Sequence, residues 1–185
     1  YVFTIMDLNH IDRPENSSAA KRFYYKLIMR PAARRANGVL TISEFSRQRI
    51  INWASIDSSK VINVGCGVDS SFNPQKTIYN PGYQYILCVS NRKKHKNEGR
   101  VIHAFHKAAI ENEIHLIFTG HKNEEIQRII GSLNLEDRIV FVGNVPEKSL
   151  PSLYRGALGL VFPSLYEGFG LPPLEAMACG TPVLA

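Results

Sequence analysis

The sequence predicts an α/β protein built on a parallel, doubly wound sheet. Apolar runs of strand length alternate with longer amphipathic runs through the C-terminal part of the chain. Strands and helices that alternate in this way form parallel sheets with right-handed crossovers. Turns rich in glycine and polar residues follow the predicted strands, and ligands of such sheets bind beyond the carboxyl ends of the strands.

The N-terminal part of the chain has its own alternation. Apolar runs predict strands at residues 1–8, 38–42 and 60–64. The polar residues 9–18 are predicted to be a loop. Residues 19–35 have helical spacing, but Pro31 should kink or divide that helix because it has no N–H group. Ser43 is predicted to be the N-cap of a further helix.

The C-terminal part follows a linker. Residues 71–82 contain two prolines and a glycine without a clear period, which predicts a connection between two domains. Beyond it, strands are predicted at residues 84–89, 114–119, 138–142, 157–162 and 182–185. Helices are predicted between them at residues 97–110, 123–133, 149–155 and 174–180. We therefore expect an N-terminal domain at residues 1–70 and a C-terminal domain at residues 83–185.

The composition is ordinary for a soluble globular protein, with 44% apolar and 21% charged residues and no apolar run of membrane-spanning length. The net charge of +6 suits phosphate-bearing ligands or an anionic membrane surface, but it is too small and too dispersed to indicate nucleic acid. Cys66, Cys88 and Cys179 are isolated, which predicts buried or free thiols in a reducing compartment. The chain opens and ends in strand-like runs, so we expect an internal piece of a longer protein.

The other elements are arranged around residues 167–175, Glu-Gly-Phe-Gly-Leu-Pro-Pro-Leu-Glu, between a predicted strand and a predicted helix. Pro172 and Pro173 suit the first turn of that helix, where an N–H group needs no partner. A helix N-terminus is an anion site, and the two glycines let the backbone approach a ligand closely. The carboxylates of Glu167 and Glu175 can accept hydrogen bonds from hydroxyl groups. Phosphate together with hydroxyl groups describes a nucleotide-sugar.

Each of these features also has a simpler interpretation. Glu175 could only favour the first turn of a helix through its dipole, and Glu167 could be an ordinary loop carboxylate. Residues 90–97, Ser-Asn-Arg-Lys-Lys-His-Lys-Asn, could form a solvated basic turn. The position of this run after a predicted strand, beside the proposed phosphate site, favours a role in anion binding.

The run from Pro163 to Val183 resembles the Glu-x7-Glu segment of retaining glycosyltransferases with the GT-B fold. This family comprises glycogen-synthase-like enzymes and polysaccharide or lipid mannosyl- and glucosyltransferases (glycosyl transferases group 1). The resemblance implies a Rossmann-like donor domain, incomplete at its C-terminal end, preceded by the end of a Rossmann-like acceptor-side domain. It also implies that the protein moves a sugar from a nucleoside diphosphate to a hydroxyl acceptor, with retention at the anomeric carbon.

Segments of the N-terminal part resemble the same family. Thr4-Ile-Met-Asp-Leu8 is similar to a strand that usually ends in His-Asp, but Met6 holds the histidine position here. His10 is either a substitute for that histidine, which can lie near the reacting sugar, or a merely exposed loop residue. Ser43-Glu-Phe-Ser-Arg47 and Gly67-Val-Asp69 are also similar to family segments, and the second marks the crossing into the C-terminal domain.

The resemblance assigns roles to individual residues. It implies that Arg92 and Lys96 hold the donor diphosphate and neutralise the leaving group, and that Glu167 meets a hydroxyl group of the transferred sugar. It implies that Glu175 accepts hydrogen bonds from the ribose. Backbone groups would contact the nucleobase, the phosphates or the sugar at Asn144, Val145, Gly168, Phe169, Gly170 and Leu171.

The sequence contains no Asp-x-Asp pair, no Walker loop and no Gly-x-Gly-x-x-Gly fingerprint, and no His or Cys cluster has metal-ligand spacing. We therefore expect no metal and no cofactor besides the nucleotide-sugar donor, with basic side chains in place of a metal ion. The expected partners are this donor and a glycan or lipid-linked acceptor, and no nucleic acid. The expected location is the cytoplasm, either free or peripheral at the cytoplasmic face of the membrane.

Two alternatives stay open at this point. A GT-B nucleotide-sugar epimerase would use a related donor site without an acceptor, and a non-catalytic module would only bind nucleotide. The products formed from a labelled donor distinguish them, because they are a glycoside, an isomer or nothing. The chain by itself is expected to catalyse no transfer, and the sugar, the nucleobase and the acceptor are not readable from the sequence.

Overall fold

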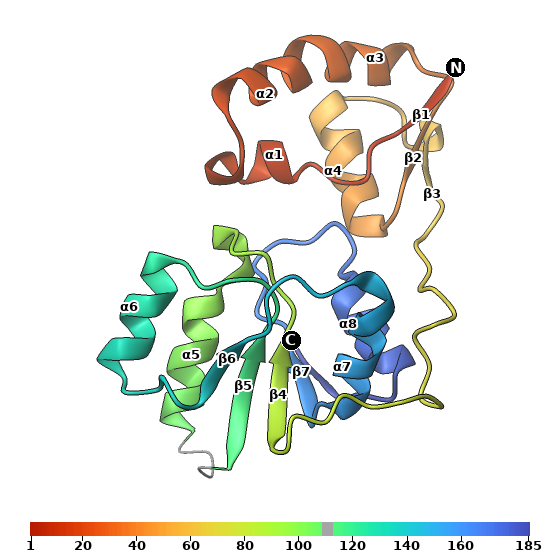
Figure 1. The fold of residues 1–185 in the computed structure, drawn as a ribbon. Coiled ribbons are helices and arrows are strands. Elements are labelled where there is room, and N and C mark those ends of the chain that lie inside the picture. The colour runs from red at the N-terminus through yellow and green to blue at the C-terminus, as the bar shows by residue number, and fades with distance from the viewer. Residues whose placement is uncertain (109–112) are drawn as a thin grey trace. The chain divides into compact units, whose positions relative to one another are not determined.

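The computed structural model describes residues 1–108 and 113–185, which form two compact units (Figure 1). The first unit comprises residues 1–67 together with residues 166–170. The second comprises residues 68–165 and 171–185, apart from the four residues that are not described. No helix within the described ranges has the length and apolarity that a membrane span requires.

The first unit is built on a three-stranded parallel sheet with the order β1-β2-β3. Its strands are β1 (Val2–Thr4), β2 (Gly38–Thr41) and β3 (Val61–Asn63). After β2 the chain forms α4 (Glu44–Ala54), and the side chain of Ser43 caps this helix by accepting a hydrogen bond from the backbone N–H of Ser46. The predicted cap is therefore confirmed. The buried core of the unit consists of Ile5, Leu8, Ala33, Ala36, Val39, Ile50, Ala54 and Val61.

The helix predicted at residues 19–35 is divided near its proline, as expected. α2 (Ala19–Tyr24) leads into a π-helical turn (Tyr25–Met29), which leads into α3 (Arg30–Arg35). The N–H of Arg30 donates to the carbonyl of Tyr25, five residues earlier, so the helix is locally wider than an α-helix. This wider turn makes room for the ring of Pro31, which would clash with a carbonyl of the preceding turn in a regular helix.

The prediction of a loop at residues 9–18 is wrong in part. They contain α1 (Asn9–Asp12) and a 3-10 turn (Pro14–Asn16). Oδ1 of Asp7 accepts a 2.9 Å hydrogen bond from the N–H of Asn9 and so satisfies one of the donors that a helix start leaves open. A helix of four residues is too short to show the apolar period by which helices are recognised in a sequence.

The second unit is built on a five-stranded parallel sheet with the order β6-β5-β4-β7-β8. Its strands are β4 (Gln84–Cys88), β5 (Ile114–Phe118), β6 (Ile139–Phe141), β7 (Gly159–Val161) and β8 (Val183–Leu184). Its helices are α5 (Glu98–Lys107), α6 (Glu124–Ser132), α7 (Leu150–Gly156) and α8 (Leu171–Ala178). All five predicted strands are confirmed, with slightly shorter ends. The predicted end of the helix at Ile110 lies outside the described residues.

Alternate residues of the central strand face opposite helix layers. Leu87 on β4 belongs to a buried apolar cluster with Tyr154 of α7 and Ala176 of α8. The next residue, Cys88, belongs to a second cluster with Ile102 of α5. Helices α7 and α8 therefore cover one face of the sheet, and α5 and α6 cover the other (Figure 1). This arrangement confirms the doubly wound fold.

The strand order places a topological switch between β4 and β7. β4 leads through α5 to β5 on one side, whereas β7 pairs with the other edge of β4. Ligands of doubly wound sheets bind at such a switch, beyond the carboxyl ends of the strands. The loops that follow β4 and β7 are tied together there. The Leu165 N–H donates to the His95 carbonyl at 2.8 Å, and Nδ2 of Asn97 donates to the Pro163 carbonyl at 3.2 Å.

The structure describes every residue between β3 and β4, and this stretch forms no helix and no β-strand. The guanidinium of Arg155 donates hydrogen bonds to the carbonyls of Asn73 and Thr77, both at 3.0 Å. Phe72 is buried in the core of the second unit. The predicted linker, residues 71–82, is therefore packed as part of that unit.

Candidate functional site

A cavity of about 620 Å³ lies at the carboxyl ends of β4, β5 and β6 in the second unit. Its wall is formed by the turns that follow these three strands, with Ser90, Arg92, His121, Asn144 and Val145 among its residues. The volume is within the range of pockets that hold a small-molecule ligand. This is also the edge of a doubly wound sheet at which ligands bind.

Two glycines shape the turns of this cavity. Gly120 and Gly143 have φ angles of 75° and 68°, which side chains other than glycine's rarely allow. The N–H of Gly120 donates a 2.7 Å hydrogen bond to the carbonyl of Gly143, and this bond joins the turns after β5 and β6. A Cβ atom on Gly143 would lie 3.2 Å from the ring of His121. The close approach of the two turns therefore depends on glycine.

Arg92 lines the cavity, but groups of the protein hold its guanidinium. Its Nε atom donates to the His121 carbonyl at 2.8 Å, and its terminal nitrogens donate to the Thr119 carbonyl and to the Glu98 carboxylate. The side chains of Arg92 and Glu98 are 13% and 5% exposed, so their ion pair is largely removed from water. Arg92 thus joins the turn after β4 to the end of β5 and to the start of α5.

Lys96 lies in the same loop, in a 3-10 turn (Lys94–Lys96). Its Nζ atom is 5.4 Å from the centre of the Phe162 ring, a cation–π contact. Phe162 directly follows β7, so this contact places the ammonium group between the carboxyl ends of β4 and β7. A positive charge at the switch point is well placed for an anionic ligand.

Glu175 lies in the second turn of α8, because this helix begins three residues before the start predicted at residue 174. Because prolines are tolerated where N–H groups need no partner, α8 begins at Leu171 and its first turn includes Pro172 and Pro173. The hydroxyl of Tyr154 donates a 2.7 Å hydrogen bond to Oε2 of Glu175. The carboxylate is therefore oriented by a buried side chain of α7.

The segment that carries Glu167, residues 166–170, belongs to the first unit. The carbonyl of Gly168 accepts hydrogen bonds from the hydroxyl groups of Ser43 and Ser46, the latter at 3.2 Å. A Cβ atom on Gly168 would lie 2.8 Å from Cβ of Asp7, closer than real Cβ contacts come. Only glycine fits this position.

On the other side of Glu167, the hydroxyl of Tyr166 donates a 2.8 Å hydrogen bond to Oδ2 of Asp12. Nε of Arg49 donates to the same oxygen at 2.9 Å, and a terminal nitrogen of Arg49 donates to Oδ1. The Tyr166 ring also packs edge-on against Phe45, with 5.5 Å between the ring centres. Glu167 is half-buried between these two fixed neighbours.

The candidate residues fall into two sets. The second unit contains Arg92, Lys96, Asn144, Val145, Leu171 and Glu175, and the first contains Glu167, Gly168, Phe169 and Gly170. Among the candidates in the second unit, Arg92, Asn144 and Val145 line the cavity together. Lys96, Leu171 and Glu175 do not line it.

Reasoning from the sequence missed two residues of this region. Tyr154 is a core tyrosine with no motif around it, so only the fold could identify it as the partner of Glu175. Asp7 is close enough to Gly168 to exclude a side chain there. The family-like segment at residues 4–8 was the signal that could have drawn attention to it.

The two residues considered for the family's histidine position differ in their surroundings. Met6 is 63% exposed. The ring of His10 packs edge-on against Tyr25, with 5.8 Å between the ring centres. His10 is half-buried rather than fully exposed.

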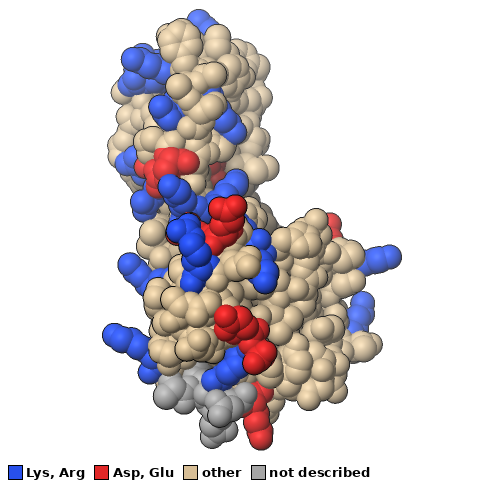
Figure 2. Space-filling model, turned by 60° about the vertical axis from the view of Figure 1, so that its left-hand side comes forward, with Lys and Arg blue, Asp and Glu red and all other residues tan. Residues whose placement is uncertain are grey.

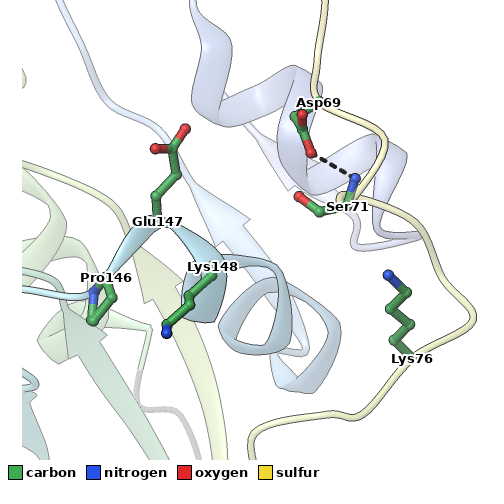
Figure 3. A pocket seen from close by; sticks show the side chains of 6 residues that line it. All are labelled: Asp69, Ser71, Lys76, Pro146, Glu147 and Lys148. Atoms are coloured by element: carbon green, nitrogen blue, oxygen red, sulfur yellow. Dashed lines mark hydrogen bonds between the residues drawn. The ribbon is translucent and has the colours of Figure 1, made fainter.

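A larger cavity, about 760 Å³, includes no residue of the turns after β4 and β5 (Figure 3). Asp69, Ser71 and Lys76 line it from one segment, and Glu147 and Lys148 line it from the turn before α7. Oδ1 of Asp69 accepts a 2.8 Å hydrogen bond from the Ser71 N–H, and hydrogen bonds from Ser71 hold the pKa of Asp69 below its ordinary value. Both acidic and basic side chains line this larger cavity. The smaller cavity at the strand ends is therefore the better candidate for an anionic ligand.

In the part of the chain that the structure describes, no group of three or more His, Cys, Asp and Glu side chains is placed to hold a metal ion. The three cysteines are free, and Cys88 and Cys179 are buried, as predicted. Burial raises the pKa of the Cys88 thiol to about 12.

Two curated relatives match nearly the whole chain. The O-antigen chain mannosyltransferase B of Escherichia coli is 29% identical over 99% of this chain and 52% of its own length. The O-antigen chain mannosyltransferase RfbU of Salmonella typhimurium is 31% identical over 98% of this chain and 50% of its own length. The chain thus spans about half the length of the curated relatives it matches.

Solved structures show the fold. A sucrose-phosphate synthase from Thermosynechococcus elongatus matches with a TM-score of 0.78 at 21% identity, over 98% of this chain and 49% of that one. HepE of Anabaena, solved in complex with UDP and glucose, matches with a TM-score of 0.72 at 22% identity, over 98% of this chain and 51% of that one. The chain has the GT-B fold that the sequence predicted. The model of the family described as glycosyl transferases group 1 matches residues 69–185, and the chain belongs to this family.

Proposed function

We propose that this chain carries the donor-binding part of an enzyme that transfers a hexose from a nucleoside-diphosphate sugar to a hydroxyl group of a glycan or lipid-linked acceptor. The observation that carries the proposal is the cavity at the carboxyl ends of β4, β5 and β6, in a chain that belongs to a glycosyltransferase family. The UDP and glucose bound to HepE support a nucleotide-sugar donor. The names of the two curated relatives make mannose the first sugar to test and an O-antigen-type polysaccharide the first product.

The donor would lie across the switch point of the second unit. Its nucleobase would contact the backbone near Asn144 and Val145 in the cavity wall. Its ribose would donate hydrogen bonds to Glu175, which Tyr154 holds in place. The ammonium group of Lys96 would face the diphosphate.

Arg92 has a different task in this proposal from the one implied by resemblance alone. Its guanidinium is already bound by the Glu98 carboxylate and by two backbone carbonyls. We propose that it keeps the loop after β4 in the shape that presents Lys96, and that it adds positive charge to the cavity wall. The backbone of residues 168–171 would contact the phosphates or the sugar, and Glu167 would accept a hydrogen bond from a hydroxyl group of the sugar.

The transfer would proceed with retention, as the resemblance of residues 167–175 to retaining enzymes suggests. The bond between the anomeric carbon and the phosphate oxygen breaks, and a bond from the acceptor oxygen to the same face of that carbon forms. The acceptor's proton passes to the departing phosphate. Fixed positive groups stabilise the charge on the leaving group, so no divalent metal is required.

The test is the complete enzyme with a radiolabelled mannosyl donor and a glycan acceptor. A glycoside with the donor's anomeric configuration, determined by NMR spectroscopy and formed equally well in the presence of a chelator, is the expected result. Free isomerised sugar would instead show an epimerase, and nucleotide binding without any product would show a binding module. Activity that is lost with chelator and restored only by magnesium or manganese would contradict metal independence.

We also propose that the enzyme works in the cytoplasm, where the donors of such enzymes would be met. The free state of its cysteines supports a reducing compartment. Fractionation of cells that produce the complete enzyme tests this location.

A further inference from the structure

Helix α4 and its cap hold the residue that follows Glu167. The carbonyl of Gly168 accepts hydrogen bonds from the hydroxyl groups of Ser43 and Ser46, and Ser46 is fully buried. The hydroxyl oxygen of Ser43 also accepts a hydrogen bond from the N–H of Ser46, so one hydroxyl group both caps the helix and holds the segment. The backbone directly after Glu167 is therefore fixed to the start of α4.

The residue before Glu167 is held from the same helix. The ring of Tyr166 packs edge-on against Phe45, and its hydroxyl donates a 2.8 Å hydrogen bond to Oδ2 of Asp12. Burial and this hydrogen bond raise the pKa of Tyr166, so the hydroxyl group stays protonated and remains a donor at neutral pH. With both of its neighbours held, Glu167 has a fixed place in the first unit.

Arg49 supports Asp12 in turn. Its Nε atom donates to Oδ2 of Asp12 at 2.9 Å, and a terminal nitrogen donates to Oδ1. Two such bonds fix the plane of a carboxylate. The Asp12 side chain is only 10% exposed, so its charge needs a partner close by. Without Arg49, the carboxylate would have no fixed orientation to offer to the hydroxyl of Tyr166.

Helix α4 is a rigid support for these contacts. Phe45 and Ser46 come four and three residues before Arg49, so both lie beside it on the surface of the helix. Ile50 and Ala54 of the same helix are fully buried in the core of the first unit. Side chains on a packed helix are placed more accurately than side chains on loops.

We propose that Arg49 is a positioning residue for the transfer reaction. It acts through Asp12 and Tyr166 and holds the carboxylate of Glu167 where a hydroxyl group of the sugar can reach it. This inference rests on the function proposed above and on the role of Glu167 in it. The family resemblance assigns no role to Arg49, Asp12 or Tyr166.

The test compares turnover with nucleotide affinity in the complete enzyme. The side chains proposed to bind the nucleotide belong to the second unit, whereas Arg49 belongs to the first. Arg49→Met should therefore lower kcat roughly tenfold or more and change the affinity for a nucleoside diphosphate less than about twofold. Tyr166→Phe, which keeps the ring packed against Phe45, should have the same two effects.

The double variant Arg49→Met with Tyr166→Phe tests the route of the effect. It should be about as slow as the slower single variant, because both changes break the same series of contacts. Losses that multiply in the double variant would show that Arg49 does not act through Tyr166 and would contradict the proposal.

Arg47 provides a matched control on the same helix. Its guanidinium donates to the carbonyls of Ser58 and Val61, both at 2.8 Å, and so ties α4 to the start of β3. Basic side chains are spread over the first unit in Figure 2, so the loss of one of them changes the surface charge to a similar extent in either variant. Arg47→Met should lower the melting temperature but keep kcat within about twofold of the unmodified enzyme. An equal loss of turnover in Arg47→Met and Arg49→Met would show a merely structural role and overturn the proposal.

A second readout does not need the transfer reaction. In a Glu167→Cys variant, the rate at which a water-soluble maleimide modifies residue 167 reports how often this half-buried segment opens. Mass spectrometry of the peptide that contains residue 167 measures this rate. Adding Arg49→Met or Tyr166→Phe should raise it about tenfold, because a hydrogen bond to a charged group is lost, whereas adding Arg47→Met should not.

These measurements separate the inference from the function on which it rests. A complete enzyme that forms no glycoside would contradict the proposed function, and the maleimide rates would then decide whether Arg49 positions the segment. An active enzyme in which Arg49→Met and Tyr166→Phe change neither kcat nor the maleimide rate would contradict the inference alone.

Discussion

The hydroxyl of Tyr154 donates a 2.7 Å hydrogen bond to Oε2 of Glu175, and this bond joins α7 to α8 beneath the proposed donor site. Burial and the neighbouring carboxylate raise the pKa of Tyr154, so its hydroxyl group stays a donor throughout the neutral range. Oε1 of Glu175 makes no hydrogen bond within the described residues and is the atom that we expect to meet the ribose.

The first prediction concerns this pair. Tyr154→Phe should weaken the binding of a nucleoside diphosphate to the complete enzyme by about 0.5–1.5 kcal/mol, because the carboxylate loses its fixed orientation. Glu175→Ala should weaken binding by about 1–3 kcal/mol. Glu175→Gln is the control for structure, since its amide oxygen still accepts from Tyr154 and the melting temperature should not fall. Titration calorimetry measures the affinities, and unchanged binding for Tyr154→Phe and Glu175→Ala would exclude the ribose assignment.

The second prediction concerns the segment that carries Glu167. Gly168→Ala would place a Cβ atom 2.8 Å from Cβ of Asp7, so the segment must shift and its hydrogen bonds from Ser43 and Ser46 must weaken. Turnover should fall at least tenfold, with little change in the affinity for nucleotide alone. Gly67→Ala is the matched control, because nothing lies within 4 Å of its Cβ position. Equal turnover for the two variants would show that the position of this segment does not matter.

The parts of the fold that could be predicted are those specified by local pattern. The alternation of strands and helices after residue 83 needs only the periods of apolar residues, and the structure confirms it. The capping role of Ser43 is equally local, because its partner is three residues away. The one-turn helix α1 could not be predicted from the sequence, because four residues are too few to show a period of apolar residues.

The parts of the site that could not be predicted depend on contacts between distant segments. The motif around residue 175 shows a carboxylate, but its partner Tyr154 comes from another helix. The family resemblance singles out two cations of the basic run, Arg92 and Lys96, and implies the same task for both. Only the fold shows that Glu98 and two backbone carbonyls hold Arg92, whereas Lys96 lies over an aromatic ring at the switch point.

The third prediction concerns the structural role of Arg92, which distinguishes it from Lys96 and is measured as the free energy of unfolding. Arg92→Ala should lower the free energy of unfolding by about 3–5 kcal/mol, because it leaves the buried carboxylate of Glu98 without its partner. Adding Glu98→Gln should restore most of this loss, since the uncompensated charge is then gone. Urea denaturation followed by circular dichroism measures both variants. A fully stable Arg92→Ala single variant would contradict the structural role of Arg92.

The fourth prediction tests whether Lys96 faces the phosphates, by comparing two ligands with and without phosphate groups. Lys96→Ala should weaken the binding of a nucleoside diphosphate by about 1.5–3 kcal/mol and leave the binding of the parent nucleoside unchanged, because only the former has phosphates. Lys94→Ala, an exposed lysine of the same loop, is the matched control and should change neither. Calorimetry with both ligands gives the answer, and an equal loss for nucleoside and nucleoside diphosphate would mean that Lys96 does not face the phosphates.

The last prediction uses the acid sensitivity of the first unit. Burial alone would raise the pKa of Asp12, but hydrogen bonds from Arg49 and Tyr166, together with the charges of Arg49 and Arg13, outweigh it and hold this pKa below its ordinary value. A carboxyl whose pKa is lowered by folding stabilises the fold above its unfolded pKa, which is about 3.9 for Asp. This stabilisation is lost as the pH falls through the lower, folded value.

Between pH 7 and pH 3, the stability of Asp12→Asn should therefore fall less than that of the unmodified protein, and Arg49→Met should behave in the same way. The single tryptophan, Trp53, lies in the first unit, so its fluorescence during urea denaturation reports on this unit. The same loss of stability in all three proteins would show that the contacts of Asp12 with Arg49 and Tyr166 do not favour its charged form.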